Sequence, residues 1–529
     1  MTNEALIRTA KHVTEGLGSH PVVLPRSAGR DVLKKTFDSF VNNFAFKTSS
    51  VTRLTTTAVA IAVFGAGVLA QKPDRSTPPR PGAPPALKLP PIQKQKLSNG
   101  LAVWIIEQHE VPLAQVNLIV RAGAGVDPAD KYGVASMTAN MLDEGADGKS
   151  SLELADAVEF LGAQLGTSST FDYSAVRLST PVSKLADALP LMADVVLRPS
   201  FPSAELERLR KERLTRLLQA RDDPAAIIEA AFPRLVFGDK HRYGAAAAGG
   251  TAEAKAMTLD DLRSFHSAYY RPENSTVLVV GDVTPATVLP MLERAFGAWQ
   301  AAGIAAPVSA IPAAAQLTKR QIYIIDKPGA AQSQIRIGWV GVPRATPDYP
   351  TLQVLNTILG GSFTSRLNTN LRETHGYSYG AFSGFEERIS PGAFSARADV
   401  QTDKTAEALK EFFNEFGGIL KPIPGEEIDK AKNYVALGFP AEFESTADLA
   451  QKMEEQVVHG LPDEYFPSYI RSVVQVSKPG VEKAATQYIQ PDKFAVVIVG
   501  DRKIIEPGVR ALNLGPVEVL TIDQVLGSM

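Results

Sequence analysis

Apolar positions along the chain follow two patterns, short unbroken runs and longer runs with helical spacing. Residues 275–281 (STVLVVG) and 495–500 (AVVIVG) are apolar stretches of strand length, and Gly-Asp closes each one. Residues 151–161 and 203–220 are predicted helices, each starting with a serine that is a candidate N-cap. The mixed order of strands and helices predicts an α+β fold, in which a sheet packs against helices.

The same order of elements occurs twice along the chain. In the first half we predict strands at 97–108, 114–122 and 170–180, and helices at 151–161, 182–196 and 203–220. In the second half we predict strands at 321–325, 334–340, 377–385 and 393–400, and helices at 350–359 and 405–420.

Two pairs of similar segments indicate an internal duplication. YRPENSTVLVVGD ends at Asp282 and IQPDKFAVVIVGD ends at Asp501, 219 residues later. Upstream, VNLIVRAGAGVDPADKYG resembles IRIGWVGVPRATPDY, and their tyrosines, Tyr132 and Tyr349, are 217 residues apart. A nearly constant offset is what a duplicated domain produces. The sequence therefore predicts two homologous domains, each a sheet with packed helices.

Composition narrows the chemistry that the chain can perform. A chain of 529 residues is too long for a single core. The net charge of −2 means that the chain has no excess of positive charge with which to bind nucleic acid. The absence of cysteine excludes disulfides, thiol catalysis and cysteine-ligated metals. Only the 7 histidines remain as imidazole ligands or bases.

The amino-terminal region carries a secretion signal by its pattern. Residues 58–70 (AVAIAVFGAGVLA) form an apolar run that is too short to span a bilayer and right for a signal peptide, and Arg53 precedes it. Residues 72–91 are too rich in proline to pack. We expect a secreted protein, periplasmic or otherwise extracytoplasmic, that contacts the membrane only if the signal stays uncleaved as an anchor.

These signals divide the chain into parts. We expect an extra segment at 1–50, which is not translated in the natural protein if Val51 is the true start, a signal peptide at 51–70, a Pro-rich linker at 71–91, a first domain at 92–300, a linker at 301–318, a second domain at 319–510 and a tail at 511–529.

Residues 360–382 (GGSFTSRLNTNLRETHGYSYGAF) are the most informative stretch for function. The pattern predicts a glycine-lined turn, a short helix with Arg366 and Arg372, a break at Gly376, and a strand with Tyr377 and Tyr379. A guanidinium and a phenol seven residues apart across such a corner can converge on one point. Together they can hold and polarise a peptide carbonyl.

This stretch, with LSNGLAVWII at 97–106 and FHSAYYRPENSTVLVVGD at 265–282, resembles the pitrilysin or insulinase family of metallopeptidases, family M16, and within it the two-domain processing-peptidase branch. The resemblance covers roughly residues 92–505. It implies two metalloprotease-like half-domains that form a clamshell around a peptide. It also implies that Arg372 and Tyr379 are the catalytic Arg/Tyr pair. We further expect substrate contacts from Gly360, Gly361, Ser362 and Tyr377.

The zinc motif of the family is degenerate in this chain. Family members that bind zinc carry H-x-x-E-H on the helix after Gly133, with a glutamate between the histidines as general base. Ser136, Ala139 and Asn140 stand at those positions, and none of them supplies an imidazole or a general base. Where the family has its third ligand, a glutamate on the 203–220 helix, this chain has Arg213 and Arg216 close by. We therefore expect no metal in this chain, and no activity when it is alone.

Two functions follow from the resemblance, and a third rests on fold analogy alone. The first is the non-metal subunit of a heterodimeric zinc peptidase. It supplies Arg372 and Tyr379 to a peptide substrate, while a sister subunit with H-x-x-E-H supplies zinc. The alternative is a catalytically inactive structural or assembly subunit of the same fold. The third is a lone peptide-binding or chaperone-like protein that uses the clamshell cavity.

Overall fold

The structure is a computed structural model that describes residues 82–300 and 311–527, and the part from Gly82 onward is one compact unit. The segments predicted at 1–50 and 51–70 lie outside the described residues, as do 71–81 and 301–310 of the two predicted linkers. Within the described ranges, none of the helices has the length and apolar character needed to cross a bilayer.

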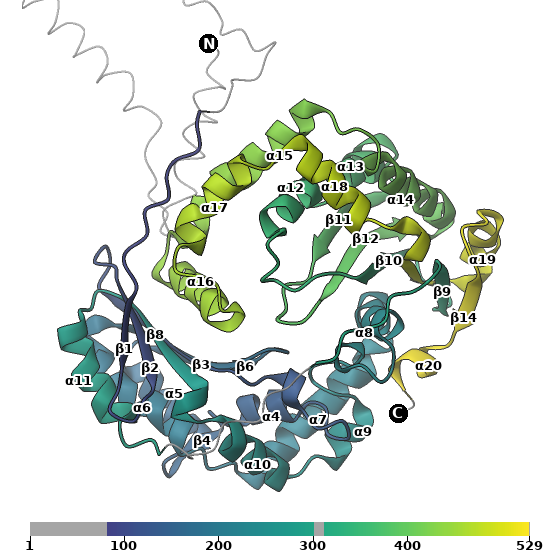
Figure 1. The fold of residues 1–529 in the computed structure, drawn as a ribbon. Coiled ribbons are helices and arrows are strands. Elements are labelled where there is room, and N and C mark those ends of the chain that lie inside the picture. Colours follow the sequence, from purple (N-terminus) through teal and green to yellow (C-terminus); the bar gives the residue numbers. More distant parts are fainter. Residues whose placement is uncertain (1–81, 301–310, 528–529) are drawn as a thin grey trace, which may run out of the picture. The chain divides into compact units, whose positions relative to one another are not determined.

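Two six-stranded sheets form the framework (Figure 1). The first runs in the order β1-β2-β8-β3-β7-β6, from strands β1 (Gln93–Lys96), β2 (Ala102–Glu107), β3 (Leu113–Val120), β6 (Gln164–Ser169), β7 (Ser174–Pro181) and β8 (Ser275–Gly281). The second runs in the order β11-β12-β10-β13-β9-β14, from strands β9 (Gln321–Asp326), β10 (Gln332–Val340), β11 (Ser378–Phe385), β12 (Ala393–Gln401), β13 (Ala495–Gly500) and β14 (Val517–Leu520).

Five strands of the two sheets correspond one to one. Ala102 of β2 pairs in parallel with Thr276 of β8, and Gln321 of β9 pairs in parallel with Ala495 of β13, so the same pairing recurs 219 residues later. The order from β2 to β6 likewise matches the order from β9 to β11. The predicted α+β fold with two homologous halves is confirmed.

The sixth strand differs between the halves. Antiparallel β1 completes the first sheet from the amino-terminal side, whereas parallel β14 completes the second from the carboxyl-terminal side. The sequence predicts a tail at 511–529, but β14 makes residues 517–520 part of the second sheet. The polar sequence of β6, QLGTSS, gave no strand signal because β6 is an edge strand with partly exposed residues.

Helices surround the two sheets. Those of the first half are α4 (Val134–Met141), α5 (Ser151–Phe160), α6 (Leu185–Leu197), α7 (Ser203–Ala220), α8 (Pro224–Phe237), α9 (Thr251–Ala256), α10 (Leu259–Tyr269) and α11 (Pro285–Phe296). Those of the second half are α12 (Tyr349–Leu359), α13 (Arg366–Asn368), a π-helix (Thr369–Thr374), α14 (Thr405–Ile419), α15 (Gly425–Gly438), α16 (Thr446–His459), α17 (Tyr465–Val474), α18 (Lys478–Tyr488), α19 (Arg502–Ala511) and α20 (Ile522–Leu526).

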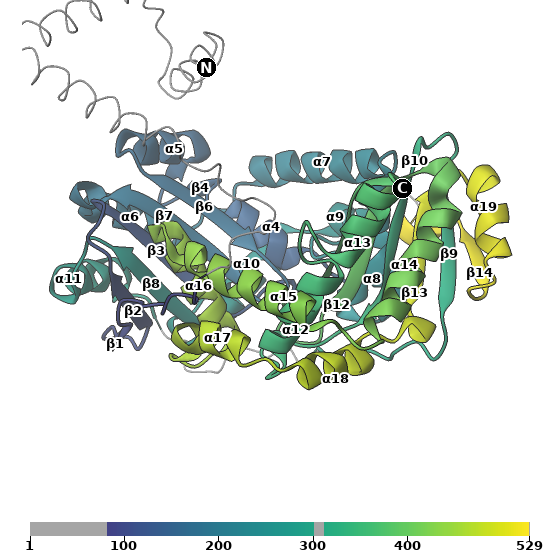
Figure 2. The ribbon, with the colours of Figure 1, turned by 90° about the horizontal axis from the view of Figure 1, so that it is seen from above.

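Each half places one helix on the sheet of the other half. Helix α16 packs on β8 and β3 of the first sheet, and α8 packs on β13 and β10 of the second (Figures 1 and 2). Met453 of α16 belongs to one buried apolar cluster with Leu278 and Val280 of β8. The central strands are therefore buried on both faces, which is why their sequences are almost continuously apolar.

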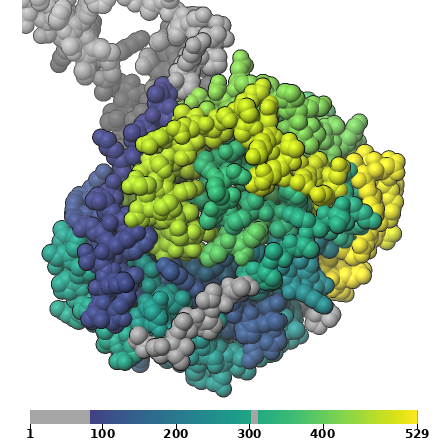
Figure 3. All heavy atoms as spheres, in the orientation of Figure 1, coloured from purple at the N-terminus to yellow at the C-terminus, as the bar shows by residue number. Residues whose placement is uncertain are grey.

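The chain ends of the described unit also join the two halves. Leu89 and Ile92, at the start of the first half, pack against the core cluster of the second half, and in Figure 3 this purple segment borders the yellow-green helices. At the other end, α20 packs on α8, and the Arg221 guanidinium donates to the Gly527 carbonyl at 2.8 Å.

A buried ion pair holds α16 to the first sheet. The Glu454 carboxylate, 2% exposed, accepts from Arg177 Nε at 2.8 Å and Nη2 at 2.6 Å, and from Asn117 Nδ2 at 2.6 Å. The counterpart in the second half is looser: Glu229 of α8 accepts from Arg336 Nη1 at 2.6 Å and lies 3.8 Å from Arg397 Nη1.

Candidate functional site

The loop after α12 packs tightly on strand β11 and on α12 itself. Helix α12 ends at Leu359, and a side chain at the next residue, Gly360, would begin 2.5 Å from the backbone nitrogen of Ser383 on β11. A side chain at Gly361 would begin 2.6 Å from Asn356 Nδ2. Both glycines therefore allow the chain's own backbone and side chains to approach closely. Ser362 is buried and donates its hydroxyl to the Thr357 carbonyl at 3.1 Å.

The predicted short helix consists of α13 and the π-helix that follows it. It carries Arg366 and Arg372, as predicted, and Gly376 breaks it with φ +65°. A left-handed residue at that position favours glycine. Arg366 does not join the site, because its Nε donates to Glu427 at 2.8 Å.

Asn368 connects the two sides of the corner. Its side chain is fully buried, donates from Nδ2 to the Phe363 carbonyl at 2.6 Å, and accepts from the Ala381 backbone N–H at 3.1 Å. The loop before the helix and the strand after it are therefore fixed to one residue. Such a buried amide with both ends engaged rigidifies its surroundings.

A β-bulge presents Tyr379 to solvent. The pairing of β11 with β12 shifts by one residue between Ser378 and Ala381, and the Ser378 hydroxyl closes the bulge by donating to the Gly380 carbonyl at 2.6 Å. Tyr379 is 87% exposed. Tyr377 lies apart from it, packed on the core of the second half and stacked on His375 with ring centroids 4.9 Å apart.

Arg372 and Tyr379 come together, as the spacing predicts. The Arg372 guanidinium carbon lies 5.1 Å from the Tyr379 ring centroid and 4.5 Å from the Phe363 ring centroid. This geometry is that of a cation–π contact on two rings. Sequence reasoning missed Phe363, and its only signal is an aromatic residue in the glycine turn. The Nε of Arg372 is 3.3 Å from Glu373, and among the described residues neither Nη atom has a polar partner.

An arginine lies beside the degenerate zinc motif of the first half, and we call this part of the molecule the degenerate corner. Ser136, Ala139 and Asn140 lie on α4, and the Arg213 side chain reaches Ser136 from α7. Its Nη2 donates to the Ser136 hydroxyl at 3.1 Å. A hydroxyl, a methyl group and an amide beside a guanidinium do not fit a zinc ion, which takes imidazole, thiolate or carboxylate ligands. Within the described ranges, no group of three or more histidine and acidic side chains could hold a metal.

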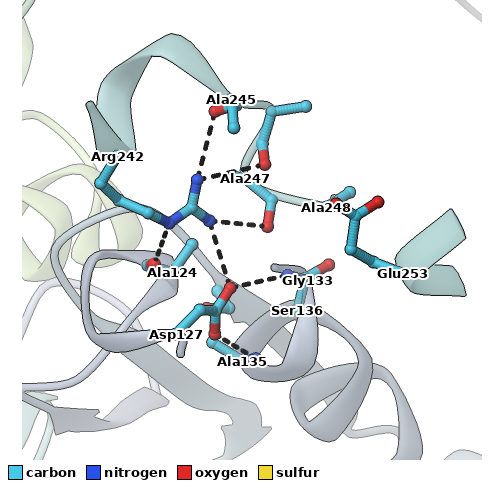
Figure 4. Close-up of polar contacts among 12 residues, drawn as sticks. Ala124, Asp127, Gly133, Ala135, Ser136, Arg242, Ala245, Ala247, Ala248 and Glu253 are labelled. Atoms are coloured by element: carbon cyan, nitrogen blue, oxygen red, sulfur yellow. Dashed lines mark hydrogen bonds and ion pairs between the residues drawn. The ribbon is translucent and has the colours of Figure 1, made fainter. Parts of the chain in front are cut away.

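An acidic residue anchors the start of α4. The Asp127 carboxylate accepts from the backbone N–H of Gly133 at 2.7 Å and of Ala135 at 2.9 Å, and pairs with Arg242 at 3.1 Å (Figure 4). Arg242 also donates from Nε to the Ala124 carbonyl at 2.6 Å. Burial raises the pKa of Asp127, while these donors oppose the rise. These contacts hold the start of α4 in place.

Two family profiles match the chain. One, described as insulinase (peptidase family M16), matches residues 102–241, and the other, described as peptidase M16 inactive domain, matches residues 256–435. An uncharacterized zinc protease of Mycobacterium leprae is 26% identical over 349 residues, which cover 66% of this chain and 77% of the relative.

Solved structures show the same fold. A peptidase M16 inactive domain from Pseudomonas fluorescens superposes with a TM-score of 0.72 at 27% identity, over 78% of this chain and 98% of that one. The periplasmic protease PqqL from Escherichia coli superposes with a TM-score of 0.67 at 16% identity, over 80% of this chain and 49% of that one. The profiles, the relative and the fold agree, and the chain belongs to peptidase family M16.

Proposed function

We propose that this chain is the non-metal subunit of a two-chain M16 peptidase, in which Arg372 and Tyr379 bind and polarise the carbonyl of a peptide substrate. The observation that carries the proposal is the exposed stack of the Arg372 guanidinium on the Tyr379 ring, at 5.1 Å. The partner is a sister subunit of the same family with an intact H-x-x-E-H motif.

The chemistry suits acyl transfer. Attack on a peptide carbonyl places negative charge on its oxygen, and donors fixed in advance at that point stabilise the transition state. In the described part of the chain, both Nη atoms of Arg372 lack a partner, and Tyr379 is exposed with its phenol. The sister subunit's zinc site would supply the activated water. Asn368 and the β-bulge hold the two donors in place before substrate arrives.

Two other arginines near the two sites form polar contacts of their own. Arg366 is paired with Glu427, and Arg213 donates to Ser136 and to backbone carbonyls. Arg372 also pairs through Nε, with the neighbouring Glu373, but its guanidinium stacks on the exposed Tyr379 ring. This contrast favours a binding role for Arg372.

The site of action is proposed to be outside the cytoplasm. The apolar run at 58–70 has the length of a signal peptide, and the Pro-rich residues after it suit a spacer. The related fold of PqqL belongs to a periplasmic protease. Both observations support an extracytoplasmic peptidase, with a peptide as substrate.

The test is reconstitution. The chain should show no peptidase activity alone, and should gain it on mixing with an H-x-x-E-H sister subunit from the same organism. Cleavage of a quenched fluorescent peptide library measures this. As a control, the sister subunit with its general-base glutamate changed to glutamine should remain inactive in the mixture. A stable complex whose activity does not depend on Arg372 or Tyr379 would instead support the structural or assembly role.

A further inference from the structure

The Arg213 side chain occupies the centre of the degenerate corner. It is 4% exposed, and it extends from α7 to the start of α4 and to the loop at 245–249. Nη1 donates to the Gly133 carbonyl at 3.3 Å and to the Ala248 carbonyl at 3.1 Å, and Nη2 donates to Ser136 Oγ at 3.1 Å. One cation thus joins three separate segments.

Two backbone segments lie very close together at this corner, one around Gly133 and one around Gly249. Gly133 and Gly249 both have positive φ, at +96° and +72°. A side chain at Gly133 would begin 2.2 Å from the Ala248 carbonyl oxygen, and one at Gly249 would begin 2.1 Å from the Tyr132 carbonyl oxygen. The two segments therefore touch backbone to backbone. Their carbonyl oxygens, those of Gly133 and Ala248, meet at the Arg213 guanidinium.

No carboxylate of the described chain forms an ion pair with Arg213. The nearby Asp127 is committed to Arg242 and to the backbone of α4 (Figure 4). Burial, aided by the charge of Arg216, lowers the pKa of Arg213 to about 10, so the guanidinium still carries its charge at neutral pH. Neutral oxygen atoms accept all three hydrogen bonds of this buried positive charge, and the charge of Asp127 also favours it.

We propose that Arg213 is a built-in cation that takes the place of the metal ion in the first half. Its guanidinium holds α4, α7 and the 245–249 loop together, and it keeps a divalent cation out of the corner. The exclusion is electrostatic as well as chemical, because a divalent ion beside Ser136 would lie next to a fixed positive charge. The proposal concerns this chain alone and does not depend on a partner subunit.

The first experiment reinstates the metal ligands with and without Arg213. One variant carries Ser136→His, Ala139→Glu and Asn140→His, and a second adds Arg213→Glu. A matched control adds Arg216→Glu, an exposed charge reversal on the same helix, to the first variant. Zinc affinity is measured by competition with a chromophoric chelator, using the full chain and zinc alone.

We expect one equivalent of zinc in the variant with Arg213→Glu, and at least about 100-fold weaker binding when Arg213 is kept, because the ion must then bind beside a buried charge. The Arg216→Glu control should bind as weakly as the parent variant. Equal affinity with and without Arg213→Glu, including no binding by either, would overturn the exclusion.

The second experiment tests the organising role without new ligands. Amide hydrogen exchange is compared between Arg213→Met and the exposed control Arg216→Met. Exchange at 133–137 and 245–249 should speed up by about tenfold or more in Arg213→Met only, since a local opening there becomes easier. Unchanged exchange in Arg213→Met, with normal near-UV circular dichroism, would overturn the organising role.

Discussion

The space beside two helices differs between the halves: α4 and α7 in the first half, and α12 and α15 in the second. In the first half, Ser136 on α4 meets the buried Arg213 from α7. The 217-residue offset places Gln353 of α12 at the position of Ser136, and there the second half has a cavity of about 400 Å³, lined also by Tyr434 of α15. The Arg213 side chain therefore fills the space in the first half, whereas the corresponding space in the second half is a cavity.

The difference extends to the arginines. The first half uses a buried guanidinium to close its corner, whereas the second half, just beyond α12, presents Arg372 on an exposed aromatic stack. Duplication of a fold therefore does not duplicate a site, because function depends on which side chains remain unpaired at the surface. On our proposals, the chemistry belongs to the second half and a structural role to the first.

The largest expected effect separates these two roles. In the reconstituted two-chain enzyme, Tyr379→Phe should lower turnover by about 10²–10³, the usual cost of losing an oxyanion donor. Ser136→Ala in the first half should leave turnover unchanged, because the Ser136 hydroxyl accepts from Arg213 and lies outside the proposed Arg372 and Tyr379 site. Steady-state cleavage of a fluorescent peptide measures both. Full activity of Tyr379→Phe would remove the assignment.

The next effect concerns the contacts by which each half holds a helix of the other. Glu454→Ala leaves Arg177 and Asn117 without their buried partner, and we expect a loss of about 3 kcal/mol in the free energy of unfolding. Glu229→Ala should cost no more than about 1 kcal/mol, since its side chain is 57% exposed. Urea unfolding followed by circular dichroism gives both values. Equal losses would show that the two contacts are equivalent despite their burial.

The sequence predicted the fold class, the duplication and the convergence of Arg372 with Tyr379, because each is recorded in local patterns and offsets. It did not predict β14, which is a four-residue strand that pairs only through tertiary contact. The pattern predicted one strand with both Tyr377 and Tyr379, but Tyr377 precedes β11 and packs on the core, and Tyr379 is exposed at the bulge. The sequence also placed Arg213 near the degenerate zinc motif, but it did not predict the hydrogen bonds of the guanidinium.

A smaller effect tests the glycine turn of the second half. Gly360→Ala places a methyl group 2.5 Å from the Ser383 backbone nitrogen, and overpacking of this kind costs about 2 kcal/mol. Gly384→Ala, one residue beyond Ser383, meets nothing within 4 Å and is the matched control. Thermal unfolding compares the two. If the two variants unfold at the same temperature, the turn can shift to accept a methyl group at Gly360. Close packing would then not explain the glycine, and the expected substrate contact would be the better explanation.

The smallest effect lies at the position in the first half that the 217-residue offset relates to Gly360. Burial, with the neighbouring charge of Glu144, raises the pKa of Asp143 to about 6 from its usual 3.8. The folded chain therefore binds more protons than the unfolded chain between these values, and stability falls as pH rises through that window. Asp143→Asn should remove about 1 kcal/mol of this pH dependence, because the asparagine does not ionise. Urea unfolding at pH 4 and pH 7 measures the difference, with Asp156→Asn on α5 as the control. An unchanged pH dependence of stability in Asp143→Asn would mean that water solvates the Asp143 carboxyl group. The segment after α4 would then not bury this side chain.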